Sequence, residues 1–330
     1  MQILVIGGAR HVGDLVSSAL SNTGHTLTYL NRSEDRSHSP ASMQQEHAQL
    51  EAALAAQSFD AVIDTSLPNV DEAEDTVRQL QGRIGHYIYL SSGQVYLVRQ
   101  GIERPFREQD YEGMLMPEPK SNTYADVEWQ YGMELRRTED VFMRAWREQG
   151  FPMTALRLPM MHSERDQYNR LYHYILRLRD GGPILVPTTP NYLLRHVYVG
   201  DVVQAILRVL DSGLGKGKAF NISQDESVSL DEFLEIVGGL LDVKPQIVRV
   251  ARDVLEANGF LPDCSPFSER WMSALDNRLS KAELGMMYTP LELYLKRIVE
   301  YYTTHDMPTP AGYKRRRAEL RLLETPEPTE

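Results

Sequence analysis

Short apolar runs alternate with stretches of helical periodicity through the first half of the chain. Runs of this kind predict buried strands, and the stretches between them predict amphipathic helices that cover a sheet. In the first helical stretch, apolar residues from Val12 to Leu20 recur at i, i+3 and i+4, so one stripe faces the sheet. The pattern predicts an α/β fold with a parallel sheet. The expected strands are Gln2–Ile6, Thr26–Leu30, Ala61–Asp64, His86–Ser91 and Met153–Leu158.

The second half of the chain is divided into shorter elements by the Pro- and Gly-rich stretches DGGPILVPTTP and DSGLGKGK. Two helix starts carry a capping-box pattern, Ser229 with Glu232 and Thr289 with Glu292. In the second helix, Pro290 would take the first helical position. These features predict a second, smaller domain. The expected boundaries are 1–160 for the first domain, with 191–222 returning to it, and 161–330 for the second domain and tail.

Composition narrows the class of protein. With 330 residues, 42% hydrophobic and 25% charged, the chain has the composition of an ordinary soluble globular protein. It lacks the run of about 20 apolar residues that a membrane helix requires. Its N-terminus lacks the pattern of a secretory signal, so we expect a cytoplasmic protein with no membrane partner. A single cysteine, Cys264, excludes an internal disulfide framework and a cysteine-rich metal site.

The segment ILVIGGARHVG places three glycines, Gly7, Gly8 and Gly13, after the first expected strand and at the start of the first helix. One glycine allows the sharp turn, the second lets a pyrophosphate approach the backbone amides, and the third lets helix and strand pack closely. Amides at a helix N-terminus favour a bound anion. The glycines therefore predict a Rossmann-type domain that binds a dinucleotide; a turn with only a structural role is the alternative.

Arg10 stands inside this glycine loop, and Asn31 and Arg32 follow the second expected strand. A site for NAD usually presents a carboxylate there to the ribose 2′-hydroxyl. A guanidinium can instead hold a 2′-phosphate with two hydrogen bonds. The sequence therefore favours NADP over NAD, although Arg10 could also be a solvated loop cation.

Further segments resemble the extended short-chain dehydrogenase/reductase family, the NAD-dependent epimerase/dehydratase group. They are YLSSGQVY, YGMELRRTED, ALRLPMMHSERD, RHVYVGDVVQAI and FNISQDESVSLDEF, which together with GGARHVG span nearly the whole chain. The arginine in the glycine loop is similar to the branch written GGTRFIG, which includes chloroplast stem-loop-binding proteins. The resemblance implies a doubly wound parallel sheet with a smaller carboxyl-terminal domain. It does not specify the reaction, because the family includes epimerases, dehydratases, reductases and members without redox activity.

The resemblance implies that Ser92 and Tyr131 are the catalytic residues. Tyr131 would move a proton on or off a substrate hydroxyl while hydride passes to or from the nicotinamide, and Ser92 would hold the substrate oxygen. A purely local structural role is the alternative for each. The resemblance also implies cofactor contacts beyond the glycine loop. These additional contacts are His11, Val12, Asp64, Ser66 and Pro159.

In the family, a lysine follows the catalytic tyrosine one helical turn later, lowers its pKa and binds the nicotinamide ribose. Here that position is Leu135. Lowering a tyrosine pKa from about 10 to about 7 requires about 4 kcal/mol of phenolate stabilisation, so proton transfer should slow by about two to three orders of magnitude. Arg136 lies about 100 degrees round the helix and should point elsewhere. Lys120 and Arg157 are candidates for a cation from another element, although the spacing of neither favours it.

Three functions are compatible with this departure. In the first, the protein is a slow or altered oxidoreductase of the epimerase/dehydratase type, acting on a hydroxyl or carbonyl of a small polar substrate. Alternatively, it binds the dinucleotide without redox chemistry, as a sensor or assembly protein. Third, like the stem-loop-binding relatives, it contacts RNA, although the net charge of −11 argues against a nucleic-acid partner.

His162 and Arg165 follow the last expected strand, where the family lines its substrate entrance, and a packing role is the alternative for the histidine. No cluster of ligating residues has metal-site spacing, so no metal is expected. The run KRRR, residues 314–317, more often forms a solvated helix face, so we expect a frayed surface helix there and a disordered tail. The resemblance is compatible with a homodimer, because helices flanking the tyrosine form dimer bundles in the family.

Overall fold

The computed structural model describes residues 1–7, 11–21, 24–30, 48–55, 57–166 and 168–323. Within it the chain forms two compact units. Unit 1 consists of Met1–Met161, Val199–Ser223 and Ser273–Tyr288. Unit 2 consists of His162–Tyr198, Gln224–Met272 and Thr289–Glu330.

Unit 1 is built on a six-stranded sheet with the order β2-β1-β3-β4-β5-β9, in which every neighbouring pair is parallel. Strands β1 and β3 lie on opposite sides of the point where the strand order reverses. In sheets of this kind ligands bind at that point, outside the carboxyl ends of the strands. The expected doubly wound parallel sheet is confirmed. The strands are β1 (Gln2–Ile6), β2 (Thr26–Leu30), β3 (Phe59–Asp64), β4 (Ile84–Ser92), β5 (Met153–Leu158) and β9 (Lys218–Asn221).

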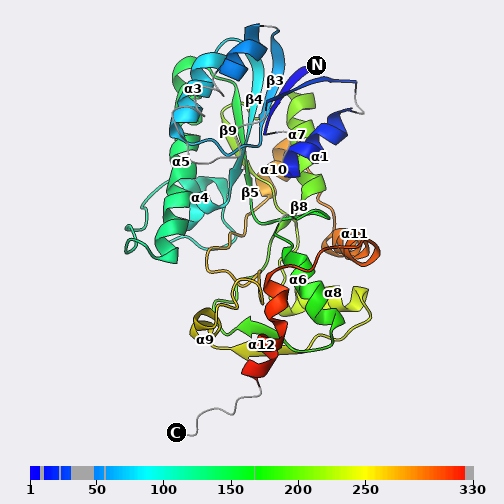
Figure 1. Cartoon of the computed structure of the whole chain (residues 1–330). Coiled ribbons are helices and arrows are strands. Elements are labelled where there is room, and N and C mark those ends of the chain that lie inside the picture. Colours follow the sequence, from blue (N-terminus) through cyan, green and yellow to red (C-terminus); the bar gives the residue numbers. More distant parts are fainter. Residues whose placement is uncertain (8–10, 22–23, 31–47, 56, 167, 324–330) are drawn as a thin grey trace. The chain divides into compact units, whose positions relative to one another are not determined.

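Helices cover both faces of this sheet, with α3 and α5 on one side and α1 and α7 on the other (Figure 1). Tyr87 and Tyr89 of β4 pack against Phe142 of α5, with ring centroids 4.9 and 5.2 Å apart. This aromatic layer holds the long helix α5 on the sheet. The described helices of unit 1 include α1 (His11–Ser21), α3 (Val70–Leu80), α4 (Gln94–Leu97), η1 (Glu108–Tyr111), α5 (Tyr124–Gln149), α7 (Val199–Ser212) and α10 (Arg278–Leu284), and residues 48–55 are also helical.

Unit 2 contains two small sheets, in which β6 pairs with β8 and β7 pairs with β10. Leu185, Leu255, Phe260 and Cys264 form one of its buried clusters. The strands are β6 (Met161–His162), β7 (Ile184–Pro187), β8 (Val197–Tyr198) and β10 (Ile247–Val250). The helices are α6 (Arg170–Arg179), α8 (Leu230–Leu240), α9 (Arg252–Ala257), α11 (Leu291–Thr304), η2 (Gly312–Arg315) and α12 (Arg316–Leu322).

One of the two predicted capping boxes is confirmed. Ser229 Oγ accepts a hydrogen bond from the amide of Glu232 at 3.2 Å, and the Glu232 carboxylate accepts from the Ser229 amide at 2.7 Å. The second prediction is wrong, because α11 begins at Leu291 and Pro290 occupies the N-cap position with a ψ of 139°. The amide of Leu291 instead donates to the carboxylate of Glu226, 65 residues earlier in the chain.

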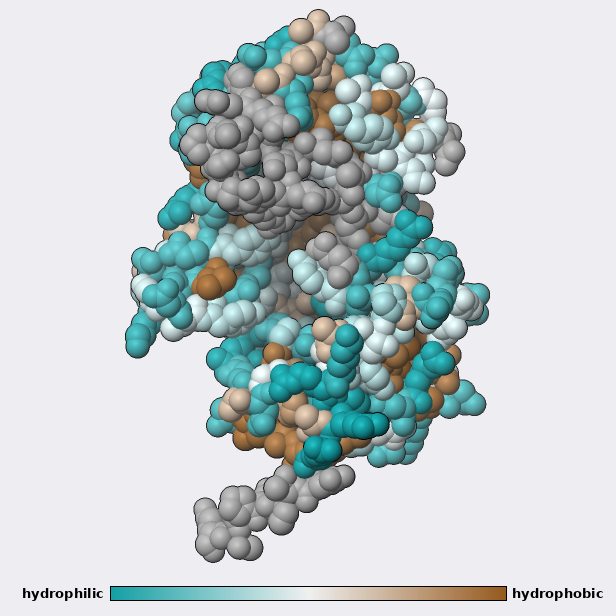
Figure 2. Space-filling view, viewed as in Figure 1, coloured by the Kyte–Doolittle hydropathy of each residue, from teal (hydrophilic) through white to brown (hydrophobic). Residues whose placement is uncertain are grey.

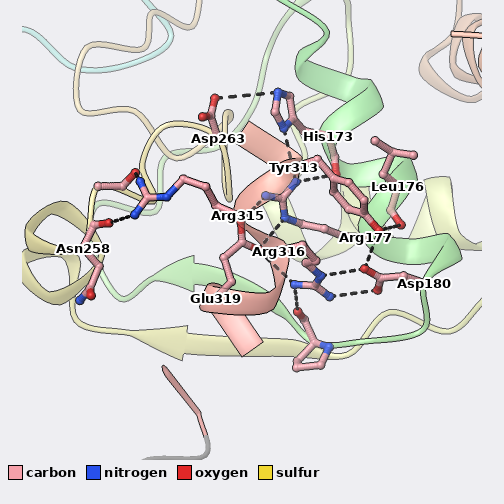
Figure 3. A network of polar contacts seen from close by, with 12 residues as sticks. His173, Leu176, Arg177, Asp180, Asn258, Asp263, Tyr313, Arg315, Arg316 and Glu319 are labelled. Carbon is pink, nitrogen blue, oxygen red and sulfur yellow. Dashed lines mark hydrogen bonds and ion pairs between the residues drawn. The ribbon is translucent and has the colours of Figure 1, made fainter. Parts of the chain in front are cut away.

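The expectation of a frayed surface helix at the basic run is also wrong. Arg316 is buried on α12 and donates to Asp180 at 2.7 and 3.0 Å, so the helix is anchored to the end of α6 (Figure 3). Glu319, one turn further on, accepts from Arg177 of α6 at 3.0 Å and from Arg316 at 3.1 Å. Asp180 from a distant segment and Glu319 from the same helix therefore neutralise Arg316, which the local sequence presents as part of a solvated run.

Candidate functional site

The turn after β1 requires a glycine at its first position. Gly7 has a φ of +81°, and its amide donates to the carbonyl of Leu30 at 2.8 Å. A Cβ at this position would lie 2.7 Å from Thr65 Oγ1. A side chain would therefore strain the backbone and collide with the loop after β3. Gly13 is buried in the first turn of α1, where its carbonyl accepts from Ser17 Oγ at 2.6 Å.

Part of the predicted cofactor site falls outside the described residues. Gly8, Arg10, Asn31 and Arg32 belong to this part. His11 and Val12 are described only as the first residues of helix α1.

Asp64 and Ser66 lie at the carboxyl end of β3, next to the Gly7 turn. Asp64 is fully buried, and its carboxylate accepts from the Ser66 amide at 2.8 Å and from the Tyr87 hydroxyl at 2.7 Å. Thr65 Oγ1 lies 3.1 Å from the carbonyl oxygen of Ile6 and 3.2 Å from that of Gly7, and donates towards both. Thr65 thereby ties the loops after β1 and β3 together at the point where the strand order reverses, and the Asp64 carboxylate orders the loop after β3.

The structure brings the segments of Ser92 and Tyr131 together. Ser92 ends β4, and its Oγ accepts from the amide of Gln94 at 3.2 Å. Tyr131 lies on α5 with 39% of its surface exposed. A Cβ on the adjacent Gly132 would lie 2.9 Å from the carbonyl oxygen of Gln94, so this glycine permits close approach of α5 to the segment that follows Ser92. The Gln94 side chain also donates to Glu128 of α5 at 3.0 Å.

Leu135 is buried, and the arginines that follow it do not replace a lysine. Arg136 donates to the carbonyls of Val95 at 2.9 Å and Tyr111 at 2.8 Å, and its guanidinium lies 3.8 Å from the centre of the Tyr111 ring. The expectation that Arg136 points elsewhere is confirmed. Arg137 is half exposed, with its Nη1 3.6 Å from a carboxylate oxygen of Glu134.

Arg157 is engaged in a buried ion pair rather than facing Tyr131 as a single cation. Its Nε donates to Glu139 of α5 at 2.9 Å, and its Nη1 donates to the Tyr96 hydroxyl at 2.7 Å. Burial by itself would lower the Arg157 pKa, but the Glu139 charge and the bond to Tyr96 raise it above its ordinary value. Ser91 Oγ also donates to Glu139, at 2.9 Å. This carboxylate therefore links α5 to both β4 and β5.

Glu139 is a residue of the site that no sequence motif indicated. It lies eight positions after Tyr131, on the buried face of α5. A carboxylate within an otherwise apolar helical face is a signal for a buried partner, because a charge there must be paired. The spacing along the sequence does not show which partner Glu139 meets.

Pro159, an expected cofactor contact, is buried directly after β5. The last residue of β5, Leu158, pairs in register with Ser92.

His162 lies in a packed interior within unit 2. It is 4% exposed, and its ring stacks with those of Phe233 and Tyr294 at centroid distances of 5.8 and 5.6 Å. Burial, with a smaller effect of the Arg170 charge, lowers the His162 pKa to about 3. These surroundings favour a neutral packing residue. Arg165 is exposed in the turn that follows β6.

The part of the chain that the structure describes contains neither a cluster of metal-binding side chains nor a membrane-spanning helix. Among residues 1–323 outside the stated gaps, no three His, Cys, Asp or Glu side chains are grouped so as to hold a metal ion. The same residues include no helix with the length and hydropathy needed to cross a membrane. On the face shown in Figure 2, hydrophilic residues are widespread and hydrophobic ones are exposed in separate patches.

Comparison with known proteins identifies the family. Residues 3–223 match the model of the NAD dependent epimerase/dehydratase family. The chain belongs to this family. The match runs from β1 to the end of β9, so it covers the sheet, the glycine turn and the segments of Ser92 and Tyr131. The resemblance inferred from the sequence motifs is confirmed.

Individual relatives are distant. Chloroplast stem-loop binding protein of 41 kDa b from Arabidopsis thaliana is 26% identical over 250 residues, which cover 70% of this chain and 60% of that protein. UDP-glucose 4-epimerase of Thermotoga maritima, solved with UDP-glucose, is 20% identical with a TM-score of 0.65, and the match covers 92% of this chain and 99% of that one. dTDP-glucose 4,6-dehydratase of Bacillus anthracis, solved with NAD, is 16% identical with a TM-score of 0.69, over 92% and 97%. These solved structures share the fold of this epimerase/dehydratase family member.

Proposed function

We propose that this epimerase/dehydratase family member binds a nicotinamide dinucleotide at the carboxyl ends of β1 and β3 and acts as an oxidoreductase with an altered active site. The observation that carries the proposal is the Gly7 turn tied to the Asp64 loop, inside a chain segment that matches the family. Backbone amides at the start of α1 would hold the diphosphate. When bound, the nicotinamide would supply hydride transfer, and Tyr131 and Ser92 would handle the proton and the oxygen of a small polar substrate.

The dTDP-glucose 4,6-dehydratase structure was solved with NAD, whereas the arginines of this chain favour NADP. We expect calorimetric titration to show NADP binding about tenfold or more tightly than NAD, because a guanidinium paired with the 2′-phosphate contributes about 1.5–3 kcal/mol. Arg32→Ala should remove most of this preference while leaving the affinity for NAD nearly unchanged. Equal affinities of the unmodified protein for both dinucleotides would contradict the assignment of Arg10 and Arg32 to the 2′-phosphate.

Leu135 makes low turnover the expected state of the native protein. Replacing it with lysine should raise dinucleotide-dependent turnover by about one to two orders of magnitude, because a cation one turn from Tyr131 stabilises the phenolate. Turnover would be followed by nicotinamide absorbance with a panel of nucleotide-linked sugars. Leu135→Met, which conserves volume, is the control and should leave turnover unchanged. A fast native enzyme that Leu135→Lys inactivates would show that Tyr131 works by another route.

The second candidate function is binding of the dinucleotide without redox chemistry, and buried Leu135 is the observation that favours it. Dinucleotide binding with no turnover in either the native protein or the Leu135→Lys variant would select it. RNA binding is a weaker candidate, because Arg315 and Arg316 of the basic run already bind carbonyls and carboxylates of unit 2. A gel shift with structured RNA at physiological salt tests it.

A further inference from the structure

Two buried histidines of unit 2 are in direct contact. His162 Nε2 lies 2.7 Å from His196 Nδ1, and both residues are almost completely buried. His196 Nε2 lies 3.5 Å from the sulfur of Met272. A hydrogen bond between two imidazoles requires a proton on one facing nitrogen and a lone pair on the other. The contact is therefore compatible with neutral rings and is lost when both rings are protonated.

Aromatic side chains from separate segments of unit 2 surround the pair. Phe233 of α8 and Tyr294 of α11 stack with His162, and Phe267 lies edge-on to it at a centroid distance of 5.1 Å. Phe267 also contacts His196, at 5.1 Å. Such walls solvate a charged imidazolium poorly, so protonation of either ring is unfavourable while the cluster stays closed.

The pair lies where the chain repeatedly enters and leaves unit 2. The five junctions between the units follow Met161, Tyr198, Ser223, Met272 and Tyr288. His162 is the first residue after the first junction, and His196 stands two residues before the second. Gln224 is the first residue after the third junction, and its backbone amide donates a hydrogen bond to the carbonyl of His196 at 2.8 Å. Met272, at the fourth, is the residue whose sulfur lies against His196.

The fifth junction leads into α11, which also reaches this cluster. The Tyr294 hydroxyl donates to the side-chain oxygen of Gln224 at 2.6 Å, and the Tyr294 ring stacks on His162 at 5.6 Å. Residues near all five junctions are thus connected through one group of side chains around two histidines.

We propose that the His162–His196 pair is a pH-sensitive clamp that holds together the connecting segments between the two units. With neutral rings the clamp is closed, and the segments after Met161 and before Tyr198 are tied to those at Gln224 and Met272. Uptake of protons replaces the hydrogen bond by two facing N–H groups of like charge. The connecting segments then separate locally, while the sheet of unit 1 and the remaining core of unit 2 stay folded.

The positive charge nearest the clamp acts in the same direction as burial. Arg170 of α6 is the cation that opposes protonation of both rings, and Asp166 holds it with an Nε to Oδ2 distance of 3.1 Å. Glu164 is occupied by the Tyr198 hydroxyl, which donates to it at 2.8 Å. On α8 and α11, the side chains that pack against His162 are those of Phe233 and Tyr294. Burial, then the Arg170 charge, lowers the pKa of His162, and burial, then the His162 and Arg170 charges, lowers the pKa of His196.

The sign of the pH dependence follows from the lowered pKa values. An opened cluster contains histidines of ordinary pKa near 6.5, whereas the closed cluster keeps them neutral. The clamp is therefore fully stable above about pH 6.5 and loses stability as the pH falls below that value. Each histidine should raise the population of the opened form about tenfold between about pH 7.5 and 5.5, and the pair about a hundredfold.

Hydrogen exchange followed by mass spectrometry, corrected for intrinsic exchange rates, tests the clamp on the full chain without ligand. Protection at the junction segments should fall about a hundredfold from about pH 7.5 to 5.5, while β1 and β4 stay protected. His162→Phe, which keeps an aromatic ring but cannot titrate, should reduce that dependence to about tenfold. His86→Asn is the matched control, because His86 is a buried histidine of β4 bonded to Thr154 in unit 1, away from the junctions. It should leave the hundredfold change intact.

Three results would overturn the clamp. They are junction protection that does not change with pH in the native protein, an unchanged pH dependence in His162→Phe, and equal loss of protection in β1 and β4, which indicates general acid unfolding. The native pH series decides by itself if a variant fails to fold. None of these measurements depends on the dinucleotide, so they test the clamp independently of the proposed function.

Discussion

Replacing Glu319 by glutamine is expected to lower the free energy of unfolding by about 3–5 kcal/mol. The Glu319 carboxylate is 1% exposed and accepts from Arg177, which is fully buried, and from Arg316 (Figure 3). A neutral amide of the same shape leaves buried Arg177 short of negative charge in a poorly solvated interior, whereas Arg316 keeps its pair with Asp180. Urea unfolding followed by circular dichroism measures the difference, with the midpoint falling and the slope unchanged.

The matched control for Glu319 is Glu74→Gln. Glu74 pairs with Arg144 at 3.2 Å, but both side chains are about half exposed. Exposed pairs of this kind contribute about 0–1 kcal/mol, so this variant should unfold at nearly the native denaturant concentration. If both substitutions have the same small effect, α12 is not anchored by the buried carboxylate as the contacts indicate.

Replacing Glu139 by glutamine is expected to cost a similar amount, about 3–5 kcal/mol, in unit 1. Its carboxylate neutralises Arg157 and accepts from Ser91, and both partners are buried at the carboxyl ends of β5 and β4. The double variant Glu139→Leu with Arg157→Met removes both charges together. It should recover most of the lost stability, since a buried ion pair can often be replaced by apolar side chains at little cost.

A double-mutant cycle on the same pair measures the coupling energy directly. Losses that simply add in the double variant would mean that Glu139 and Arg157 do not stabilise each other. Recovered stability combined with lost dinucleotide-dependent turnover would assign the pair to positioning of Ser92 rather than to folding. Ser91→Ala, which keeps the ion pair and removes only the bond to β4, separates the two contributions.

Three of the expected strands, β1, β2 and β5, have the predicted boundaries. Apolar runs between turn residues mark β1 and β5, which are buried on both faces, whereas β2 is a partly exposed edge strand. β3 and β4 each begin two residues earlier than expected. Phe59 and Ile84, their first residues, pair with each other in register. The extra residues of β3 and β4 are in strands because the two strands pair with each other. A local sequence pattern does not show which strands lie side by side. β9 was not expected at all, and its four residues are ordered by pairing with β5.

In the candidate site, too, some features could be predicted from the sequence and others could not. The glycine turn could be predicted because only a residue without Cβ tolerates the φ and the close approach of Thr65 at Gly7. The loss of the family's lysine could be predicted because one helical turn separates Tyr131 from Leu135. The partners of the charged residues could not. Arg157 meets Glu139 across 18 residues, and Arg177 meets Glu319 across 142.

The amino-acid sequence alone therefore determined the sheet class, the glycine turn and the leucine at the position of the family's lysine, because each depends on residues within a few positions of one another. Only the tertiary structure decided which charges are buried and with what partners: Arg316 within the basic run, Glu139 on α5 and the His162–His196 contact. These depend on electrostatics in a poorly solvated interior, where the energy of a charged or polar group is set by whichever distant segment folds against it.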